Sequence, residues 1–70
     1  MPKIPEISSS RVIRAFRKKG FEIIKEGKNT SMFDGERIIV IPHSNQINAY
    51  TMGGIIKDAG ITIEEFKSLL

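Results

Sequence analysis

The segment that decides the fold lies in the middle of the chain, where residues 28–42 read KNTSMFDGERIIVIP. Two stretches rich in β-branched and apolar residues flank Asp34-Gly35. Asp-Gly is a strong signal for a type I′ turn, which needs positive φ at both central positions. We therefore expect a hairpin that joins Lys28–Phe33 to Glu36–Ile41. Because the second strand is apolar, we expect it to be central in the sheet and at least partly covered on both faces, with Pro42 at its end.

A helix and a further strand are expected before the hairpin. One of the serines Ser8–Ser10 offers an N-cap oxygen to residues 11–19, RVIRAFRKK, and Gly20 supplies a left-handed stop. The apolar residues of this helix share one face and its basic residues the other. Phe21–Glu26 alternates loosely and is rich in aromatic and branched residues, as strands are. Gly27 indicates a turn or bulge after it.

Two short helices are expected after the hairpin. Thr51 is the candidate cap of the first, which Gly60 ends. Thr62–Glu65 has the pattern of a capping box and opens a last helix through Leu70. The element order is then α-β-β-β-α-α. Three antiparallel strands with helices on one face form an α+β sandwich like that of double-stranded-RNA-binding domains.

Length and composition limit the class of protein. Seventy residues are enough for one small domain, residues 1–70, and the absence of cysteine excludes a disulfide framework or a thiolate metal cluster. With no signal peptide and no apolar run of about 20 residues, we expect a cytoplasmic protein that does not enter a membrane. Eleven Lys and Arg against eight Asp and Glu give a net charge of +3. This modest excess favours a polyanionic partner.

Four motifs occur in a characteristic order between Ser8 and Leu70. They are Lys18-Lys19-Gly20-Phe21 after the first helix, Gly27-Lys28-Asn29 before the hairpin, Val40-Ile41-Pro42-His43 after its second strand, and Ile56-Lys57-Asp58-Ala59-Gly60 in a Thr-started helix. In this combination the chain resembles the HicA family of toxins. It departs from the family pattern at Asn29, where a catalytic histidine is usual.

The resemblance implies a toxin of a toxin–antitoxin pair, a metal-independent endoribonuclease that cuts messenger RNA and is held inactive by a HicB-like antitoxin. It implies no cofactor and no metal. Cleavage through the 2′-hydroxyl of RNA needs a group that exchanges protons near neutral pH, as histidine does. Asn29 can donate a hydrogen bond but cannot shuttle protons, and loss of acid–base help costs roughly 10²- to 10⁴-fold in rate. We therefore expect a poor nuclease.

Asn29 has two explanations that the sequence leaves open. It is either a deliberate replacement that disarms a toxin, or a natural residue in a chain that lost activity or moved its acid–base group. His43 is the candidate for a moved group, and its alternative role is that of a loop histidine after a strand-ending proline. The expected RNA-binding residues are Lys28 and Arg37, which hold phosphate beside position 29, together with Thr30. We expect the antitoxin to cover the same exposed segment, Gly27–Ser31.

Two other classes of function remain open. The chain could be a noncatalytic RNA-binding module, or a protein-interaction domain that binds an antitoxin-like partner and represses DNA through it. The basic residues of the first helix suit an RNA backbone, although charge on an amphipathic helix is most simply its solvated face. Tyr50 is either a base-stacking residue or partly buried packing. Gly53-Gly54 suggests close approach of a strand or partner to the helix backbone.

Overall fold

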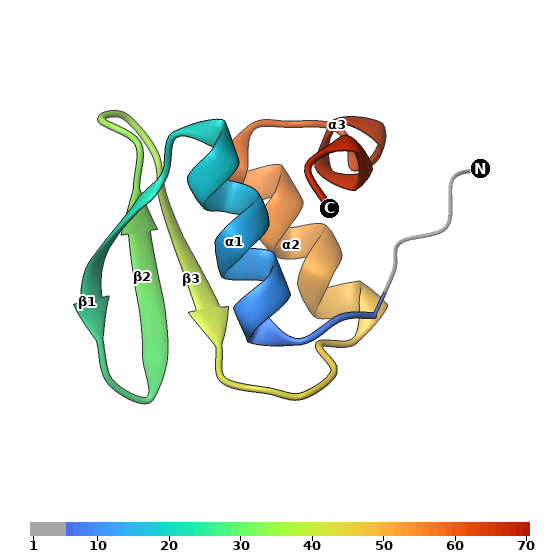
Figure 1. Ribbon diagram of the computed structural model, residues 1–70, viewed down its shortest axis with the longest axis horizontal. Helices are drawn as coiled ribbons and strands as arrows, with labels where there is room; N and C mark the ends of the chain where they lie inside the picture. Colours follow the sequence, from blue (N-terminus) through green and yellow to red (C-terminus); the bar gives the residue numbers. More distant parts are fainter. Residues whose placement is uncertain (1–5) are drawn as a thin grey trace.

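The computed structural model describes residues 6–70, which form three helices and three strands (Figure 1). Their bounds are α1 (Ser9–Lys19), β1 (Glu22–Glu26), β2 (Asn29–Phe33), β3 (Ile38–Pro42), α2 (Ala49–Ala59) and α3 (Ile63–Ser68). The expected order α-β-β-β-α-α is confirmed. No helix in this part of the chain is both long enough and apolar enough to span a membrane.

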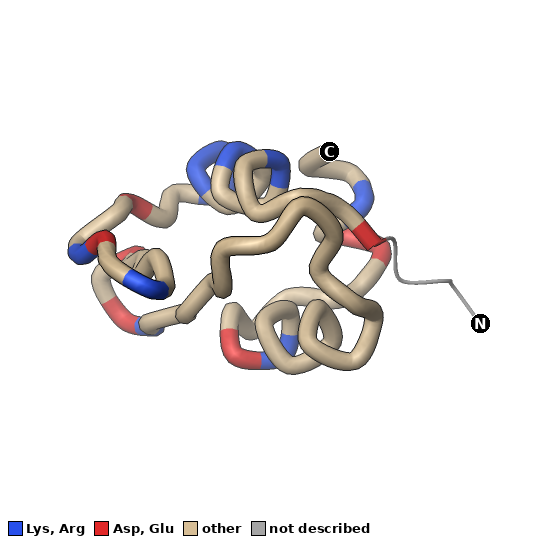
Figure 2. Tube along the Cα trace, turned by 90° about the horizontal axis from the view of Figure 1, so that it is seen from below, with Lys and Arg blue, Asp and Glu red and all other residues tan. Residues whose placement is uncertain are grey.

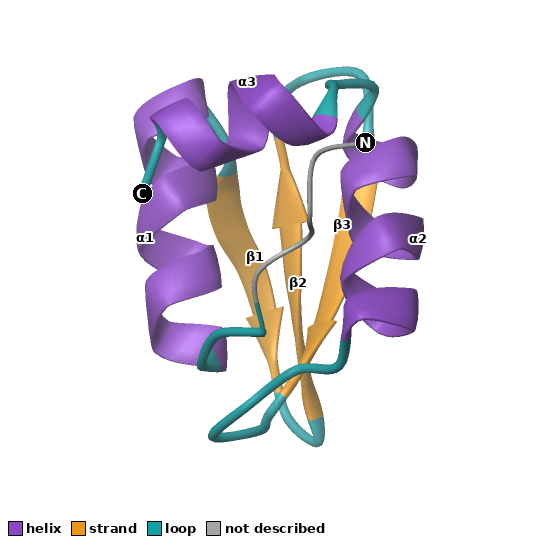
Figure 3. Ribbon diagram, turned by 90° about the vertical axis from the view of Figure 1, so that its right-hand side faces the viewer, coloured by secondary structure: helices purple, strands orange, loops and turns teal. Residues whose placement is uncertain are grey.

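The strands form one antiparallel sheet, and the helices all lie on one of its faces. The strand order is β1-β2-β3, and Figure 3 shows the three helices on the same side of the sheet. The expected α+β arrangement is therefore confirmed. The other face of the sheet, called the open face below, carries no element of the described chain.

The central strand is β2, so the expectation of a central, doubly covered β3 is wrong. Along β3 the buried residues Ile39 and Ile41 alternate with Ile38 and Val40, which are 56% and 48% exposed. This is the period-two pattern of a strand with one covered face. A continuous apolar run suggested two covered faces, but here half of that run lies on the open face.

The hairpin loop also differs from the expected type I′ turn. Phe33 pairs with Ile38, so the loop contains four residues, Asp34–Arg37. Within this loop only Gly35 has positive φ, at 104°. The Asp34 carboxylate accepts hydrogen bonds from the backbone N–H groups of Arg37 (2.7 Å) and Glu36 (2.9 Å). These bonds hold the pKa of the Asp34 carboxyl below its usual value. Hydrogen bonds from the backbone to the Asp34 side chain thus stabilise this loop, in place of the two positive-φ residues of a type I′ turn.

Helix α1 has the expected caps. Ser8 Oγ accepts from the Arg11 N–H, and Gly20 ends the helix in the left-handed region at φ 113°. Helix α2 begins earlier than expected, because Asn48 rather than Thr51 caps it. The Asn48 side chain accepts from the Thr51 N–H at 2.8 Å, and asparagine is among the strongest N-cap residues.

The last helix is capped as expected at its start but is shorter. Thr62 Oγ1 accepts from the Glu65 N–H at 3.0 Å, which is one half of the expected capping box. The Glu65 carboxylate instead binds Lys19 Nζ of α1 at 2.7 Å. Helix α3 ends at Ser68 rather than at Leu70. Glu65, which we expect from the sequence to cap its own helix, therefore forms an ion pair between α3 and α1.

Three buried phenylalanines close the end of the core beneath α3. Phe16 of α1 contacts Phe21 edge-on, with ring centroids 5.4 Å apart, and Phe66 of α3 at 5.3 Å. The larger apolar core joins both long helices to the sheet; its members include Val12, Ala15, Met32, Ile39, Ile41, Ile47, Met52, Ile55, Ile56 and Ala59. This packing fixes α1 against the sheet and so fixes the polar site at the opposite end.

Candidate functional site

The polar candidates gather at the end of the sheet opposite the Asp34–Arg37 loop. Asn29, the first residue of β2, pairs with Pro42, the last of β3, and His43 follows directly. The start of α1 is tied to the same end by the Ser9 N–H, which donates to the Ser44 carbonyl at 2.9 Å. The structure thus brings together residues from the first helix, the β1–β2 turn and the segment after β3 (Figure 1).

A pocket of about 530 Å³ opens between these segments. Its lining is mostly polar and consists of Ser9, Ser10, Ile13, Glu26, Thr30, His43, Ser44 and Asn45. Of these, only Thr30 and His43 were expected from the sequence. The sequence marks the serines near α1 only as N-cap candidates, because nothing local in it relates Ser9 to Ser44.

Thr30 and His43 form the central contact of this pocket. Thr30 Oγ1 lies 3.0 Å from His43 Nε2, and the threonine is only 1% exposed. Either the hydroxyl donates to an unprotonated Nε2, or an Nε2–H donates to the hydroxyl. His43 is thus an exposed residue of the loop after Pro42, as its alternative role has it, but its ring contacts a side chain of β2 as well. Thr30, expected among RNA contacts on the exposed segment, instead points to the helix side of the sheet and orients the imidazole.

Asn29 reaches the same end of the sheet from the opposite face. Its neighbour Thr30 is buried on the helix side, and successive side chains of a strand point to opposite faces. Asn29 is exposed and borders a separate depression of about 240 Å³, lined by Lys25, Gly27, Lys28, Asn29, Ser31 and Val40. The two candidate catalytic positions, Asn29 and His43, thus lie in different hollows on either side of one strand end.

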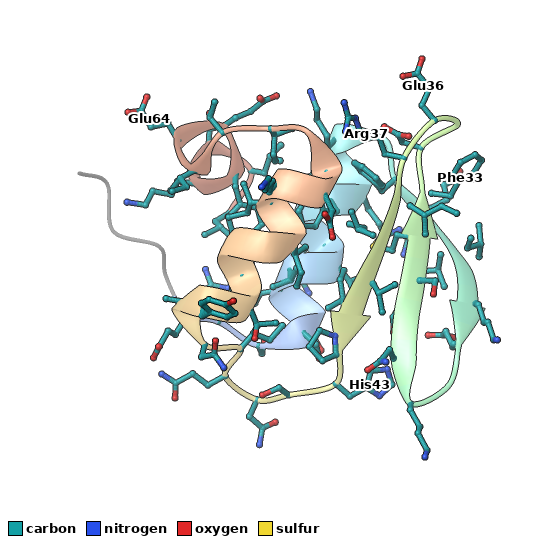
Figure 4. The ribbon with its side chains drawn as sticks, turned by 180° about the vertical axis from the view of Figure 1, so that it is seen from behind. Phe33, Glu36, Arg37, His43 and Glu64 are labelled. Carbon is teal, nitrogen blue, oxygen red and sulfur yellow. The ribbon has the colours of Figure 1, made fainter. Side chains whose placement is uncertain are left out.

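Lys28 lies beside Asn29, but Arg37 does not. Figure 4 shows Arg37 near the hairpin loop and His43 at the other end of the sheet. The Arg37 guanidinium lies over Gly60, where the Cβ of a larger residue would stand 2.6 Å from Arg37 Cζ. At the C-terminal end of α2 a positive charge interacts favourably with the helix carbonyls. The expected arrangement, in which Lys28 and Arg37 both hold phosphate beside position 29, is therefore not observed.

Tyr50 lies outside both hollows. It is 93% exposed at the start of α2, so the expectation of partly buried packing is wrong. The neighbouring Gly54 makes no close approach within the described chain, since a Cβ there would meet no heavy atom within 4 Å. Intramolecular packing thus gives no reason for this glycine.

The chemistry available at the site is that of an oriented imidazole among hydroxyl, amide and carboxylate groups. His43 is the sole histidine of the sequence, and Glu26 lines the same pocket. Among residues 6–70, no three His, Cys, Asp or Glu side chains are grouped closely enough to hold a metal ion. The arrangement therefore suits proton transfer at neutral pH.

Comparison with protein families identifies a match over most of the described chain. The family described as "HicA toxin of bacterial toxin-antitoxin" matches residues 9–61, which is more than half of the chain. The matched range runs from the start of α1 to just past α2 and includes every residue that lines the two hollows. No individual curated protein matches the chain.

Proposed function

Because the chain belongs to the HicA toxin family, whose members pair with HicB antitoxins, we propose that it is an endoribonuclease toxin that cuts messenger RNA without a metal ion. Its active centre is the end of the sheet where Thr30 holds His43. The observation that carries this proposal is the 3.0 Å hydrogen bond between these side chains inside a polar pocket. It gives the only imidazole of the sequence a partner on β2.

The proposed reaction uses the RNA's own 2′-hydroxyl as nucleophile. This oxygen attacks the adjacent phosphorus as it loses its proton, the bond from phosphorus to the 5′-oxygen breaks, and that oxygen gains a proton. When Nε2–H of His43 donates to Thr30, the lone pair of the ring is on Nδ1, which is then the proton acceptor. When the hydroxyl instead donates to Nε2, Nδ1 carries the proton and is the donor.

Asn29 acts on the other side of the strand end. Its amide is suited to donate a hydrogen bond to a phosphate oxygen, and Lys28 beside it supplies a positive charge. Since the family pattern has a histidine at this position, Asn29 leaves the site with one imidazole instead of two. We therefore propose a slow nuclease in which Asn29 binds a phosphate oxygen and His43 transfers the proton.

Cleavage assays on the isolated chain test this proposal. We expect slow cutting of messenger RNA in the presence of a metal chelator, loss of cutting in His43→Ala, and faster cutting in Asn29→His. Ser31→His is the matched control, because it places an imidazole on the same face of β2 two residues further along. Cutting that appears in Asn29→His alone and survives His43→Ala would assign catalysis to position 29. Silence of all variants would contradict the nuclease proposal and favour a noncatalytic role.

We propose further that the HicB antitoxin covers the open face. Phe33 is 36% exposed and pairs with the exposed Ile38, and Val40 continues this apolar band. Val40 also lines the depression beside Asn29. A partner that buries the band therefore also closes that depression. Val40→Asp should weaken the complex with the antitoxin, whereas Lys57→Asp on the outer surface of α2 should not.

A further inference from the structure

The positive charge of the protein is concentrated on α1. Five of the eleven Lys and Arg residues lie on this helix, which contains no Asp or Glu. The remainder of the chain has six basic against eight acidic residues. Helix α1 thus carries a formal charge of +5 and the rest of the sequence −2, which together give the net +3. Figure 2 shows the cluster of basic residues on the outer side of this helix.

Four of these residues form one exposed surface, which we call the basic face: Arg11, Arg14, Arg17 and Lys18. At 3.6 residues per turn their positions fall within an arc of about 120°. The fifth, Lys19, lies on the other side and pairs with Glu65 of α3. None of the four has an acidic partner within ion-pair distance among residues 6–70. The ion pair with Glu65 therefore compensates Lys19 and none of the four residues of the basic face.

This arrangement is unfavourable for the isolated helix. Arg14 is three residues from both Arg11 and Arg17 and four residues from Lys18. Side chains at these spacings are neighbours, and like charges there destabilise a helix. A solvated helix face would relieve the repulsion with interspersed Glu or Asp. Helix α1 has no such acidic residue, so a bound polyanion would relieve the repulsion that salt only screens.

The basic face is continuous with the pocket that holds His43. Ser9 and Ser10, at the start of α1, line the pocket, and Arg11 and Arg14 follow within one turn. The helix has 11 residues and is therefore about 16 Å long. Apart from the imidazole, no aromatic side chain lines the pocket, and α1 has none on its exposed face. Base stacking therefore has no platform here, and contact with phosphates does.

We infer that the basic face of α1 binds the phosphate backbone of the RNA, irrespective of base sequence, and leads it into the His43 pocket. This inference rests on the proposed function and names how the substrate is held. A chain of phosphates along the helix neutralises Arg11, Arg14 and Lys18 together, and the counterions released make the affinity strongly dependent on salt.

Binding measurements with RNA that cannot be cut test the inference separately from catalysis. The probes are two short duplexes of unrelated sequence whose 2′-hydroxyls are methylated, and affinity is measured from about 50 to 200 mM salt. We expect Arg14→Gln/Lys18→Gln to bind both duplexes about tenfold more weakly at low salt, with a slope of log K against log salt shallower by about 2. Lys57→Gln/Lys67→Gln has the same net charge, removes exposed charges from α2 and α3, and should bind like the unchanged chain.

The outcomes separate this inference from the proposed nuclease activity. Equal losses in the two double variants would overturn the inference, because net charge alone would then account for binding. Unchanged RNA affinity with weakened antitoxin binding in Arg14→Gln/Lys18→Gln would overturn it as well, and would assign the basic face to the antitoxin. If the α1 variant alone loses affinity while the unchanged chain cuts no RNA, the inference stands and the nuclease proposal fails.

Discussion

The guanidinium of Arg37 lies over Gly60, and so connects the hairpin loop to the end of α2. Gly60 also has φ of 74°, where a side chain is strained whatever space surrounds it. We expect Gly60→Ala to lower the free energy of unfolding by about 1–2 kcal/mol. In an Arg37→Ala background the steric part disappears and the backbone strain remains, so the cost should fall only in part. Urea unfolding of both single variants and the double variant measures this, and a neutral Gly60→Ala would contradict the assigned conformation.

Substitution of Gly54 by alanine should stabilise the protein, in contrast to substitution of Gly60. It lies inside α2 with open space around it, so Gly54→Ala should stabilise the isolated protein by about 0.5–1 kcal/mol. Thermal unfolding measures this change. Titration with the HicB antitoxin then shows whether the glycine serves an interface, because close approach of a partner would make the stabilised variant bind more weakly. A lowered melting temperature would contradict the open surroundings of Gly54.

Asp34 should make stability depend on pH. Its pKa is lowered by the hydrogen bonds from the Arg37 and Glu36 N–H groups, so the folded state favours the charged carboxylate. This stabilisation is present above the ordinary pKa of about 3.9 and is lost as pH falls through the lower, folded value. Asp34→Asn keeps an oxygen acceptor that does not titrate. The stability difference between the two proteins should therefore shrink between pH 7 and pH 3, and a constant difference would contradict the assignment.

The bond from Thr30 to His43 predicts a change that is visible without any substrate. Thr30→Val keeps the shape of the buried side chain but removes the hydroxyl from Nε2. We expect nitrogen NMR of the imidazole to show a changed balance of the two neutral tautomers. Stability should fall by about 0.5–1.5 kcal/mol. An unchanged imidazole spectrum would mean that the hydroxyl does not orient the ring.

Lys28 and Arg37 should behave differently in RNA binding. Lys28 borders the depression beside Asn29, whereas Arg37 is at the far end of the sheet. Lys28→Ala should make the slope of log K against log salt shallower by about 1, the value for one phosphate contact. Arg37→Ala should leave that slope unchanged but lower the stability of the protein. Equal loss of affinity in the two variants would instead assign both residues to phosphate.

Features with local causes were predictable from the sequence. Gly20 and Gly60 end helices because each takes a left-handed conformation, and Ser8 and Thr62 cap helices through their own side-chain oxygens. The position of β3 in the sheet was not predictable in this way. Its apolar run has the same sequence signature whether the second face meets helices or remains open.

The arrangement of the candidate site could be recognised only from the three-dimensional structure. Sequence motifs identified Asn29 and His43, but no spacing rule indicates that they approach one strand end from opposite faces. The contact between Thr30 and His43 depends on the register that pairs Asn29 with Pro42. The remaining pocket residues come from segments joined only by tertiary hydrogen bonds, such as that from Ser9 to Ser44.

The uneven distribution of charge between α1 and the rest of the sequence also makes the domain an electric dipole. A helix of +5 on a body of −2 experiences a torque in the field of any polyanion, in addition to attraction. The torque acts before contact, over roughly the Debye length of about 10 Å at 0.1 M salt. If the RNA binding proposed above holds, encounters begin with α1 turned toward the RNA, and more of them lead to a productive complex than random collision allows. The charge on one helix thus influences how fast the toxin finds its target as well as how tightly it holds it.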